Sequence, residues 1–254
     1  GVYIGNDQDE VSIVNTIFDS CVSEISSGGA VYIGASSASP KIMGCQIYNC
    51  SAGDFGGGIY FADNVAGGVV AGSYFSRCSA ASGGGGVACG TDTESLLIEN
   101  CTFVDCTADV VGGAVFVGLS GADTTIKFCE FYSNSAYSGG GVCLYDGNLD
   151  SHIVECLFDG NYASYGGALT AFTLVRPVIA GCDIKENRAS SWGAGLYFAS
   201  SSSQLLISDS EAFYQSVVVT HTNGDDIYFE PGEVNGSTEL IVLFDADVTL
   251  KSSE

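Results

Sequence analysis

The stretch SGGAVYIG, residues 27–34, places two glycines directly before an alternation of inward and outward residues. Val31 and Ile33 alternate with Tyr32, which is the period of a β-strand. Glycine weakens a strand because it has no side chain to pack, so Gly28 and Gly29 are expected to serve the backbone. We interpret them as a corner at which the chain turns sharply before it enters a strand.

This corner is one mark of a repeat that covers most of the chain. The double glycine recurs at a nearly constant step of 27 or 28 residues, beginning at residues 28, 56, 84, 112, 139 and 166, and a Gly-Ala copy of the motif begins at 193. A second element keeps the same step, from FDSC at 18–21 to FDGN at 158–161, and an aliphatic residue lies five positions before each copy. A repeat at this spacing indicates a solenoid.

The period of two and the lack of any long helical pattern decide which solenoid it is. We predict an all-β fold, a right-handed parallel β-helix of about eight or nine coils with three short strands in each coil. We assign residues 1–230 to this repeat domain. Residues 231–254 lack both marks and are predicted to form a closing strand, a cap or a joint to a neighbour.

The charge of the chain excludes some partners. The 254 residues carry a net charge of −23, with only seven Lys and Arg. Binding to nucleic acid needs clustered cations, and anionic membrane surfaces also attract basic segments. No apolar run approaches the roughly 18 residues of a membrane span. We therefore expect neither nucleic-acid binding nor membrane insertion.

Nine of the eleven cysteines follow the repeat in two columns. They could be buried thiols that act as small hydrophobic residues. Alternatively they could form disulfides between adjacent coils, because stacked positions lie about 4.8 Å apart and this separation allows a disulfide. The candidate pairs are Cys21–Cys50, Cys78–Cys106, Cys101–Cys129 and Cys156–Cys182. Asn134, Asn161 and Asn187 continue the first column and predict a ladder of side-chain amides.

Both halves of the repeat resemble those of a known family. FYSNSAYSGGGV at 131–142 and FDGNYASYGGAL at 158–169 resemble the GGA[ILV] and FxxN motifs of the polymorphic outer membrane protein (Pmp-type) repeat. The chain departs from it by having Cys in place of Asn in the first four coils and by having no membrane barrel. The resemblance implies an extracellular or cell-surface protein with an adhesive or structural role, and it implies no catalytic residues.

Acidic loops follow the strands that begin after the double glycines. Oxygen ligands suit Ca²⁺, so these loops could share calcium, although solvation alone also explains them. The calcium candidates are Asp92, Asp123, Asp146 and Asp150. No other cofactor is expected.

One outward column is largely aromatic. Stacked aromatic residues stabilise neighbouring strands, and they are also enriched at interfaces, so the column could bind a protein or a sugar. The interface candidates are Tyr3, Tyr32, Tyr60, Phe116, Tyr197 and Tyr228. Three sequons, at Asn49, Asn100 and Asn235, would be glycosylated if the source is a eukaryote.

We predict a non-catalytic extracellular module, structural or adhesive, that serves as a building block of a cell-surface or filamentous assembly. The alternatives are a carbohydrate-active β-helix enzyme and a module that binds glycan or calcium. An enzyme of this class needs paired carboxylates or a base beside them, and Asp159 and Asp183 fall in different columns. Because GVYIG at residues 1–5 begins inside a coil, we expect its edge to be covered by more chain or by a second copy. Self-association, other surface proteins and glycans are the expected partners.

Overall fold

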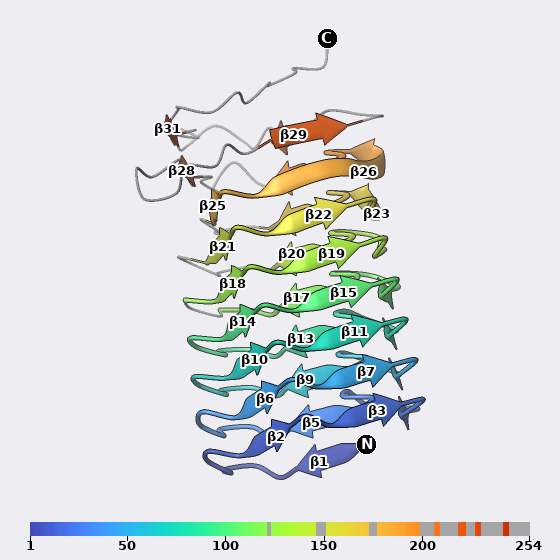
Figure 1. The fold of residues 1–254 in the computed structure, drawn as a ribbon, viewed down its shortest axis with the longest axis vertical. Coiled ribbons are helices and arrows are strands. Elements are labelled where there is room, and N and C mark those ends of the chain that lie inside the picture. The colour runs from blue at the N-terminus through green and yellow to red at the C-terminus, as the bar shows by residue number, and fades with distance from the viewer. Residues whose placement is uncertain are drawn as a thin grey trace.

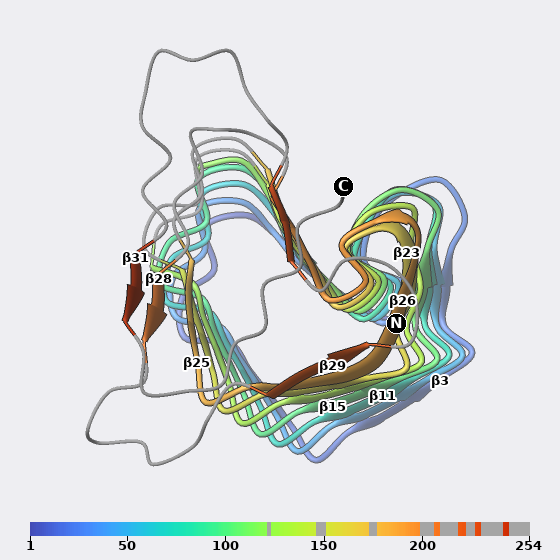
Figure 2. The same ribbon diagram turned by 90° about the horizontal axis from the view of Figure 1, so that it is seen from above.

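The chain winds into a rod of stacked coils in which every strand pairs in parallel with the strand one coil away (Figure 1). The computed structural model describes residues 1–120, 123–145, 151–172 and 177–198, together with the backbone of four later strands. Seen along the rod, the coils superpose and the chain bends back sharply near β23 (Figure 2). Within the described residues, no helix is long and apolar enough to cross a membrane.

Sheets A and B each contain nine strands. Sheet A consists of β1 (Val2–Ile4), β5 (Val31–Ile33), β9 (Ile59–Phe61), β13 (Val87–Cys89), β17 (Val115–Val117), β20 (Val142–Leu144), β24 (Leu169–Ala171), β27 (Leu196–Phe198) and β30 (Ile227–Phe229). Sheet B consists of β2 (Ser12–Val14), β6 (Lys41–Met43), β10 (Val69–Ala71), β14 (Leu97–Glu99), β18 (Thr125–Lys127), β21 (His152–Val154), β25 (Val178–Ala180), β28 (Leu206–Ser208) and β31 (Ile241–Leu243).

Sheets C and D form the other side of the rod. Sheet C consists of β3 (Ile17–Asp19), β7 (Gln46–Tyr48), β11 (Tyr74–Ser76), β15 (Thr102–Val104), β19 (Glu130–Tyr132), β22 (Leu157–Asp159), β26 (Asp183–Trp192) and β29 (Val218–His221). The short sheet D consists of β4 (Val22–Ser23), β8 (Ser51–Ala52), β12 (Ser79–Ala80) and β16 (Thr107–Ala108), and β23 (Tyr162–Tyr165) pairs with the end of β26.

The predicted parallel β-helix is confirmed, with one addition. The sequence predicted three strands per coil, but sheet D adds a fourth strand of two residues in the first four coils. Two residues are too short to show an alternation, so the pattern could not reveal this strand. The strand β31 extends sheet B inside the segment predicted to close the rod. The remainder of residues 231–254 lies outside the described residues, so the boundary at residue 230 stays a prediction.

The double glycines form a corner, as the opening stretch predicts. The first glycine of each pair has a positive φ, such as 61° at Gly112, and a Cβ there would overlap the carbonyl oxygen of Val115. At the second glycine the next coil passes close by, and a Cβ on Gly113 would overlap the carbonyl oxygen of Gly140. The first position therefore needs a left-handed conformation, and the second needs the absence of a side chain.

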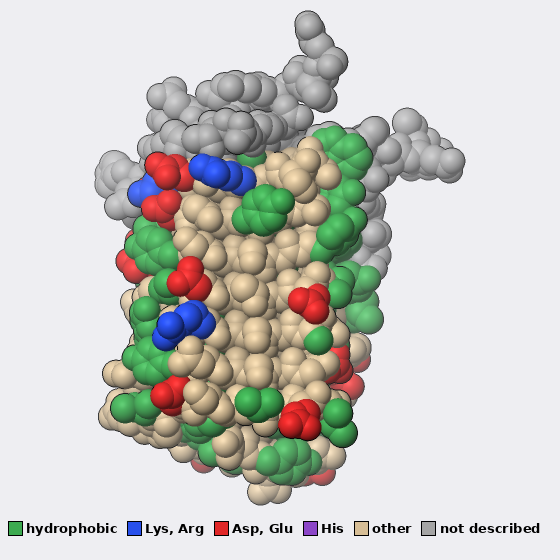
Figure 3. Space-filling view, turned by 90° about the vertical axis from the view of Figure 1, so that its right-hand side faces the viewer, with side chains coloured by type: hydrophobic (Ala, Val, Ile, Leu, Met, Phe, Trp, Pro, Cys, Tyr) green, Lys and Arg blue, Asp and Glu red, His purple; other side chains and the backbone are tan. Residues whose placement is uncertain are grey.

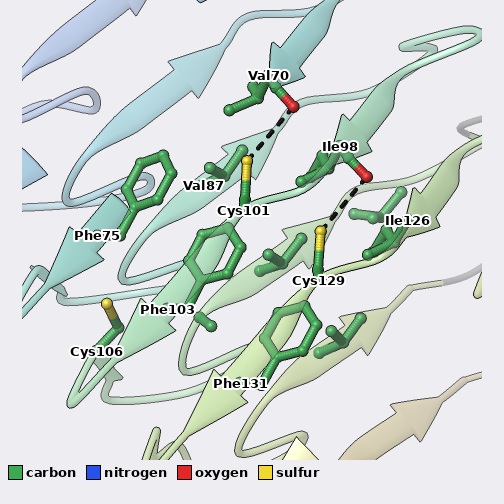
Figure 4. Close-up of a cluster of buried hydrophobic side chains, with 14 of the residues drawn as sticks. Val70, Phe75, Val87, Ile98, Cys101, Phe103, Cys106, Ile126, Cys129 and Phe131 are labelled. Carbon is green, nitrogen blue, oxygen red and sulfur yellow. Dashed lines mark hydrogen bonds between the residues drawn. The ribbon is translucent and has the colours of Figure 1, made fainter. Parts of the chain in front are cut away.

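Stacked columns of like side chains fill the interior. Four phenylalanines lie one above another, and their ring centroids are 4.6 Å (Phe75–Phe103), 5.1 Å (Phe103–Phe131) and 4.6 Å (Phe131–Phe158) apart. An aliphatic column from sheet B faces them (Figure 4). The inward residues expected from the alternation are buried in the structure: Ile98, Phe103, Val115, Val117, Ile126 and Phe131.

The asparagines of sheet C form the predicted amide ladder. The Nδ2 of Asn134 donates to Oδ1 of Asn161 at 2.9 Å, and the Nδ2 of Asn161 donates to Oδ1 of Asn187 at 2.9 Å. The same oxygens accept from backbone N–H groups one coil away, for example Asn161 Oδ1 from Asn134 N at 3.0 Å. Each buried amide is thus satisfied within the stack, as buried polar groups require.

The cysteines replace this ladder with thiols rather than disulfides. The eight cysteines of the four proposed pairs are free thiols in the structure, so none of those disulfides is formed in it. Cys101 Sγ donates to the carbonyl oxygen of Val70 at 3.5 Å, and Cys129 Sγ donates to that of Ile98 at 3.6 Å (Figure 4). Burial raises the pKa of the Cys156 thiol well above its usual range. In the column that asparagine continues, Cys78 Sγ donates to the carbonyl oxygen of Ile47 at 3.5 Å, as Asn134 Nδ2 donates to that of Phe103 at 3.1 Å.

Candidate functional site

The aromatic column predicted on sheet A lies in register, and Ala88, Cys143 and Thr170 interrupt it. Tyr3 pairs with Tyr32 and Tyr32 pairs with Tyr60 across β1, β5 and β9. The rings of Tyr3 and Tyr32 stack with centroids 5.0 Å apart, and those of Tyr32 and Tyr60 lie 5.5 Å apart. This outward row forms the floor of a groove that runs along the rod.

Two further columns, which the sequence analysis did not consider, flank the floor. One is the residue before each double glycine, which is aromatic or aliphatic at Phe55, Val111, Tyr165 and Trp192. The other lies two residues after the floor position and becomes aromatic at Tyr145 and Phe172, whose ring centroids lie 5.0 Å apart. The first flanking column could be predicted from the sequence, because the residue before the double glycine is apolar in several repeats. The groove itself follows only from the bend of the chain.

The flanking columns cover two of the predicted interface residues, Phe116 and Tyr197. Phe116 and Tyr197 face away from the interior, yet their side chains are only 8% and 5% exposed. Phe116 stacks on Phe55 with ring centroids 5.3 Å apart, and Tyr197 lies 5.2 Å from Tyr165. They support the groove from within and are not freely accessible interface residues. Only the backbone of Tyr228 is described, in register with Tyr197.

One coil contributes only small residues to all three columns. Gly83, Ala88 and Gly90 stand where other coils carry aromatic or aliphatic side chains. A Cβ on Gly83 would lie 2.8 Å from Val111 Cγ2 and 3.2 Å from Phe116 Cγ. The small residues instead let Phe55 and Phe116 approach each other across this coil.

A hollow of about 440 Å³ lies beside this contact, and Gly90 is the one of the three small residues that lines it. It is lined by side chains from coils on both sides, namely Phe55, Tyr60, Asp63, Thr91, Val111, Phe116, Leu119 and Tyr145. A second hollow of about 340 Å³ adjoins it, because Val110, Val111 and Tyr145 line both. Tyr137, Tyr165 and Phe172 complete the second hollow. The groove therefore extends over several coils and is mainly aromatic.

The charge within the groove is negative. Asp63 is the one carboxylate among the described residues that line the two hollows. Its Oδ1 accepts from the backbone N–H of Thr91 at 2.8 Å, which fixes the carboxylate one coil below the small residues. Burial, together with the charge of Asp63, raises the pKa of the Tyr60 hydroxyl, so this group stays protonated. A Cβ on Gly90 would overlap Asp63 Oδ1 and lie 2.9 Å from Tyr60 Oη, so both oxygens face the same space.

The side of the rod that includes sheet D has a different character. Small polar residues and backbone dominate its centre, and hydrophobic side chains gather along its margins (Figure 3). Ser51, Ser79 and Thr107 lie in register there. This row offers hydrogen-bonding groups along the centre of that side.

The structure separates the calcium candidates that it describes. Asp92 lies in register with Ser120, whereas Asp123 lies in register with Ser95, so the two carboxylates belong to different corners. Both are exposed, and both have a positive φ, 54° and 55°. Aspartate tolerates this conformation better than most residues, which explains the acidic loops without an ion. Asp146 and Asp150 lie outside the described residues, and within the described part no three His, Cys, Asp or Glu side chains form a metal site.

Two of the sequons occupy similar corners. Asn49 and Asn100 are exposed and have φ values of 52° and 51°. The Nδ2 of Asn49 donates to Oδ1 of Asp19 at 3.1 Å. A role in the left-handed corner accounts for both asparagines, and their glycosylation stays a prediction. Asn235 lies outside the described residues.

The structure brings together three charged residues of sheet C that the sequence analysis kept apart. Lys185 Nζ lies 3.3 Å from Asp183 Oδ2 and 3.9 Å from Asp159 Oδ2. The hydrogen bond to Asp183 raises the pKa of Lys185. The three side chains form an ion-pair cluster at the surface.

The comparisons with known proteins agree with this architecture. A search of curated proteins and a search of solved structures found no match to the chain. A family model described as a right-handed β-helix region matches residues 1–158, which is more than half of the chain. The chain therefore belongs to the right-handed β-helix family.

Proposed function

We propose that this protein is a non-catalytic, extracellular adhesive module that holds an extended glycan along its aromatic groove. The observation that carries the proposal is the groove itself, with aromatic rings on its floor and on both flanks. Binding sites for organic ligands are mostly apolar and aromatic, with a few polar groups that fix orientation. A sugar chain fits this description, because each ring has an apolar face and polar edges.

The composition of the groove favours binding over hydrolysis. Glycoside hydrolysis uses a pair of carboxylates on either side of the scissile bond. Among the described residues that line the two hollows, Asp63 is the single carboxylate, and its Oδ1 is engaged by the Thr91 backbone. The rod can thus present sugar-stacking surfaces without an acid–base pair beside them.

The extracellular placement rests on other features. The resemblance to Pmp-type repeats supports a surface role, and the net charge of −23 suits a protein that works in solution or at a surface. A solenoid also offers a long binding face, because each repeat adds one more layer to the same surface. In this proposal the module is one part of a larger surface assembly.

Calorimetric titration with a panel of neutral oligosaccharides, at least six sugar units long, tests the proposal. We expect binding, and we expect Tyr145→Ala to weaken it by about tenfold or more, because an aromatic anchor at the centre of an interface carries a large share of the affinity. Tyr74→Ala is the matched control, since Tyr74 is an exposed tyrosine on sheet C. Two results would count against the proposal: no binding to any neutral oligosaccharide, or release of reducing ends that Asp63→Asn abolishes.

A further inference from the structure

The larger hollow, which Gly90 lines, has a composition that selects among sugars. Its rings come from Phe55, Tyr60, Phe116 and Tyr145, and its one charged group is Asp63. Aromatic faces attract cations through their negative quadrupole. A carboxylate beside such faces also attracts cations, so the rings and the carboxylate together favour a cationic group on the ligand.

The charges outside the hollow point the same way. The described Lys and Arg residues lie on sheets B and C or at their corners, and none lines the groove. Lys127 pairs with Glu99, and Lys185 pairs with Asp159 and Asp183. Asp63 therefore meets a ligand without a neighbouring cation among the described residues, in a chain of net charge −23. An acidic sugar would be repelled, whereas a protonated amine would be attracted.

The geometry also shows where an amine could lie. Asp63 Oδ1 and Tyr60 Oη pack against Gly90, and all three residues line the hollow. The backbone N–H of Thr91 fixes one oxygen of the carboxylate at 2.8 Å, and the exposed side chain leaves the other oxygen accessible. A carboxylate held in this way needs little reorganisation to bind a cation.

We propose that this hollow binds the ammonium group of an amine-bearing sugar unit, between the Asp63 carboxylate and the aromatic rings around it. The inference rests on the proposed function, because the groove on either side holds the rest of the sugar chain. The amine-bearing unit is the position at which the chain is recognised, and the neighbouring units bind by stacking alone.

The test compares three oligosaccharides of equal length: one of glucosamine, one of N-acetylglucosamine and one of galacturonate. Affinities are measured by calorimetry at mildly acidic pH, where the glucosamine amine is protonated. We expect the glucosamine oligomer to bind about tenfold more tightly than the N-acetylated one, since cation–π and exposed ion-pair contributions are each modest. The galacturonate oligomer should bind most weakly.

Two variants distinguish the effect of Asp63 on ligand preference from the effect of the protein's net charge. Asp63→Asn keeps an oxygen that can accept from Thr91 N, and it should abolish the preference for the amine while neutral binding persists. Asp159→Asn removes the same charge from the opposite side, next to Lys185, and should leave the preference intact.

Each outcome has one meaning. Equal affinity for the amine and N-acetyl oligomers overturns this inference but leaves the proposed function standing. A preference that survives Asp63→Asn also overturns it and assigns the effect to overall charge. Binding of none of the oligomers overturns both the inference and the proposed function.

Discussion

Individual residues in this protein are selected by backbone conformation as much as by packing. Each described coil turns at several corners with positive φ, and these positions carry Gly, Asn, Asp or Ser in most coils. The exceptions include Phe128, with a φ of 53°. For residues with a Cβ this conformation costs roughly 1–2 kcal/mol. The repeated corners therefore explain much of the glycine content and several of the acidic residues that resemble ligands.

Gly112→Ala should reduce the free energy of unfolding by about 3 kcal/mol. The new Cβ would occupy a left-handed conformation and overlap the carbonyl oxygen of Val115. Gly72→Ala is the control, because its φ of 55° is similar but nothing lies within 4 Å of the added Cβ. It should cost about 1 kcal/mol. Urea unfolding followed by circular dichroism measures both, and equal losses would show that the steric part of this account is wrong.

At the scale of strands, like residues stacked in columns hold neighbouring coils together. Phenylalanines, aliphatic residues, thiols and amides each form such columns, and each repeats the same contact from one coil to the next. Cys and Asn share this column because either side chain can donate to a carbonyl oxygen of the adjacent coil, as Cys78 does to Ile47 and Asn134 does to Phe103. Cys106 N donates to Asn134 Oδ1 at 2.9 Å, so the thiol column joins directly to the amide column.

Phe103→Ala should destabilise the rod by about 3–5 kcal/mol, the usual cost of emptying a buried phenylalanine site. Phe103 on β15 is fully buried between Phe75 and Phe131. Thr102→Ala on the same strand faces outward and should cost less than about 1 kcal/mol. Thermal unfolding of the three proteins provides the comparison. A loss at Thr102 as large as that at Phe103 would contradict the assignment of the inward face.

On the scale of the whole molecule, the interior is a continuous stack of apolar and thiol groups inside an acidic shell. Apart from the contact of Phe55 with Phe116 across one coil, the coils contact their neighbours, so stability is approximately a sum of local terms. Buried thiols make this sum sensitive to alkaline pH. Burial raises the pKa of the Cys89 thiol to about 11, from an ordinary value of 9.0.

The folded state should therefore lose stability as the pH rises from about 9 to about 11. A raised pKa means that the fold favours the protonated thiol, so this contribution is fully present below pH 9 and is lost above it. For Cys89 alone the two units correspond to roughly 3 kcal/mol. Urea midpoints at pH 8 and pH 11 measure the loss, and Cys89→Ala should reduce it. Cys21→Ala, at a half-buried thiol, is the control and should leave the difference between the two pH values unchanged. A wild-type midpoint that does not change with pH would refute the prediction.

The sequence by itself determined the winding of the chain and its inward residues. The constant step of the double glycine sets the length of a coil, and the alternation around Phe103 or Ile98 decides which side chains enter the core. Both are local properties, so they can be read one repeat at a time. The amide ladder at Asn134, Asn161 and Asn187 follows from the same alignment, because residues in one column must stack.

Only the tertiary structure decided where the outward columns meet. The residue before the double glycine and the residue two positions after the floor lie on different parts of the coil. Their convergence around Tyr60 and Phe116 depends on the angles at which the chain turns. The cysteine columns likewise allowed disulfides or thiols, and hydrogen bonds to the carbonyl oxygens of Val70 and Ile98 favour the thiols. Corner angles and side-chain rotamers depend on how neighbouring coils pack against each other. The repeat pattern in the sequence does not specify these contacts.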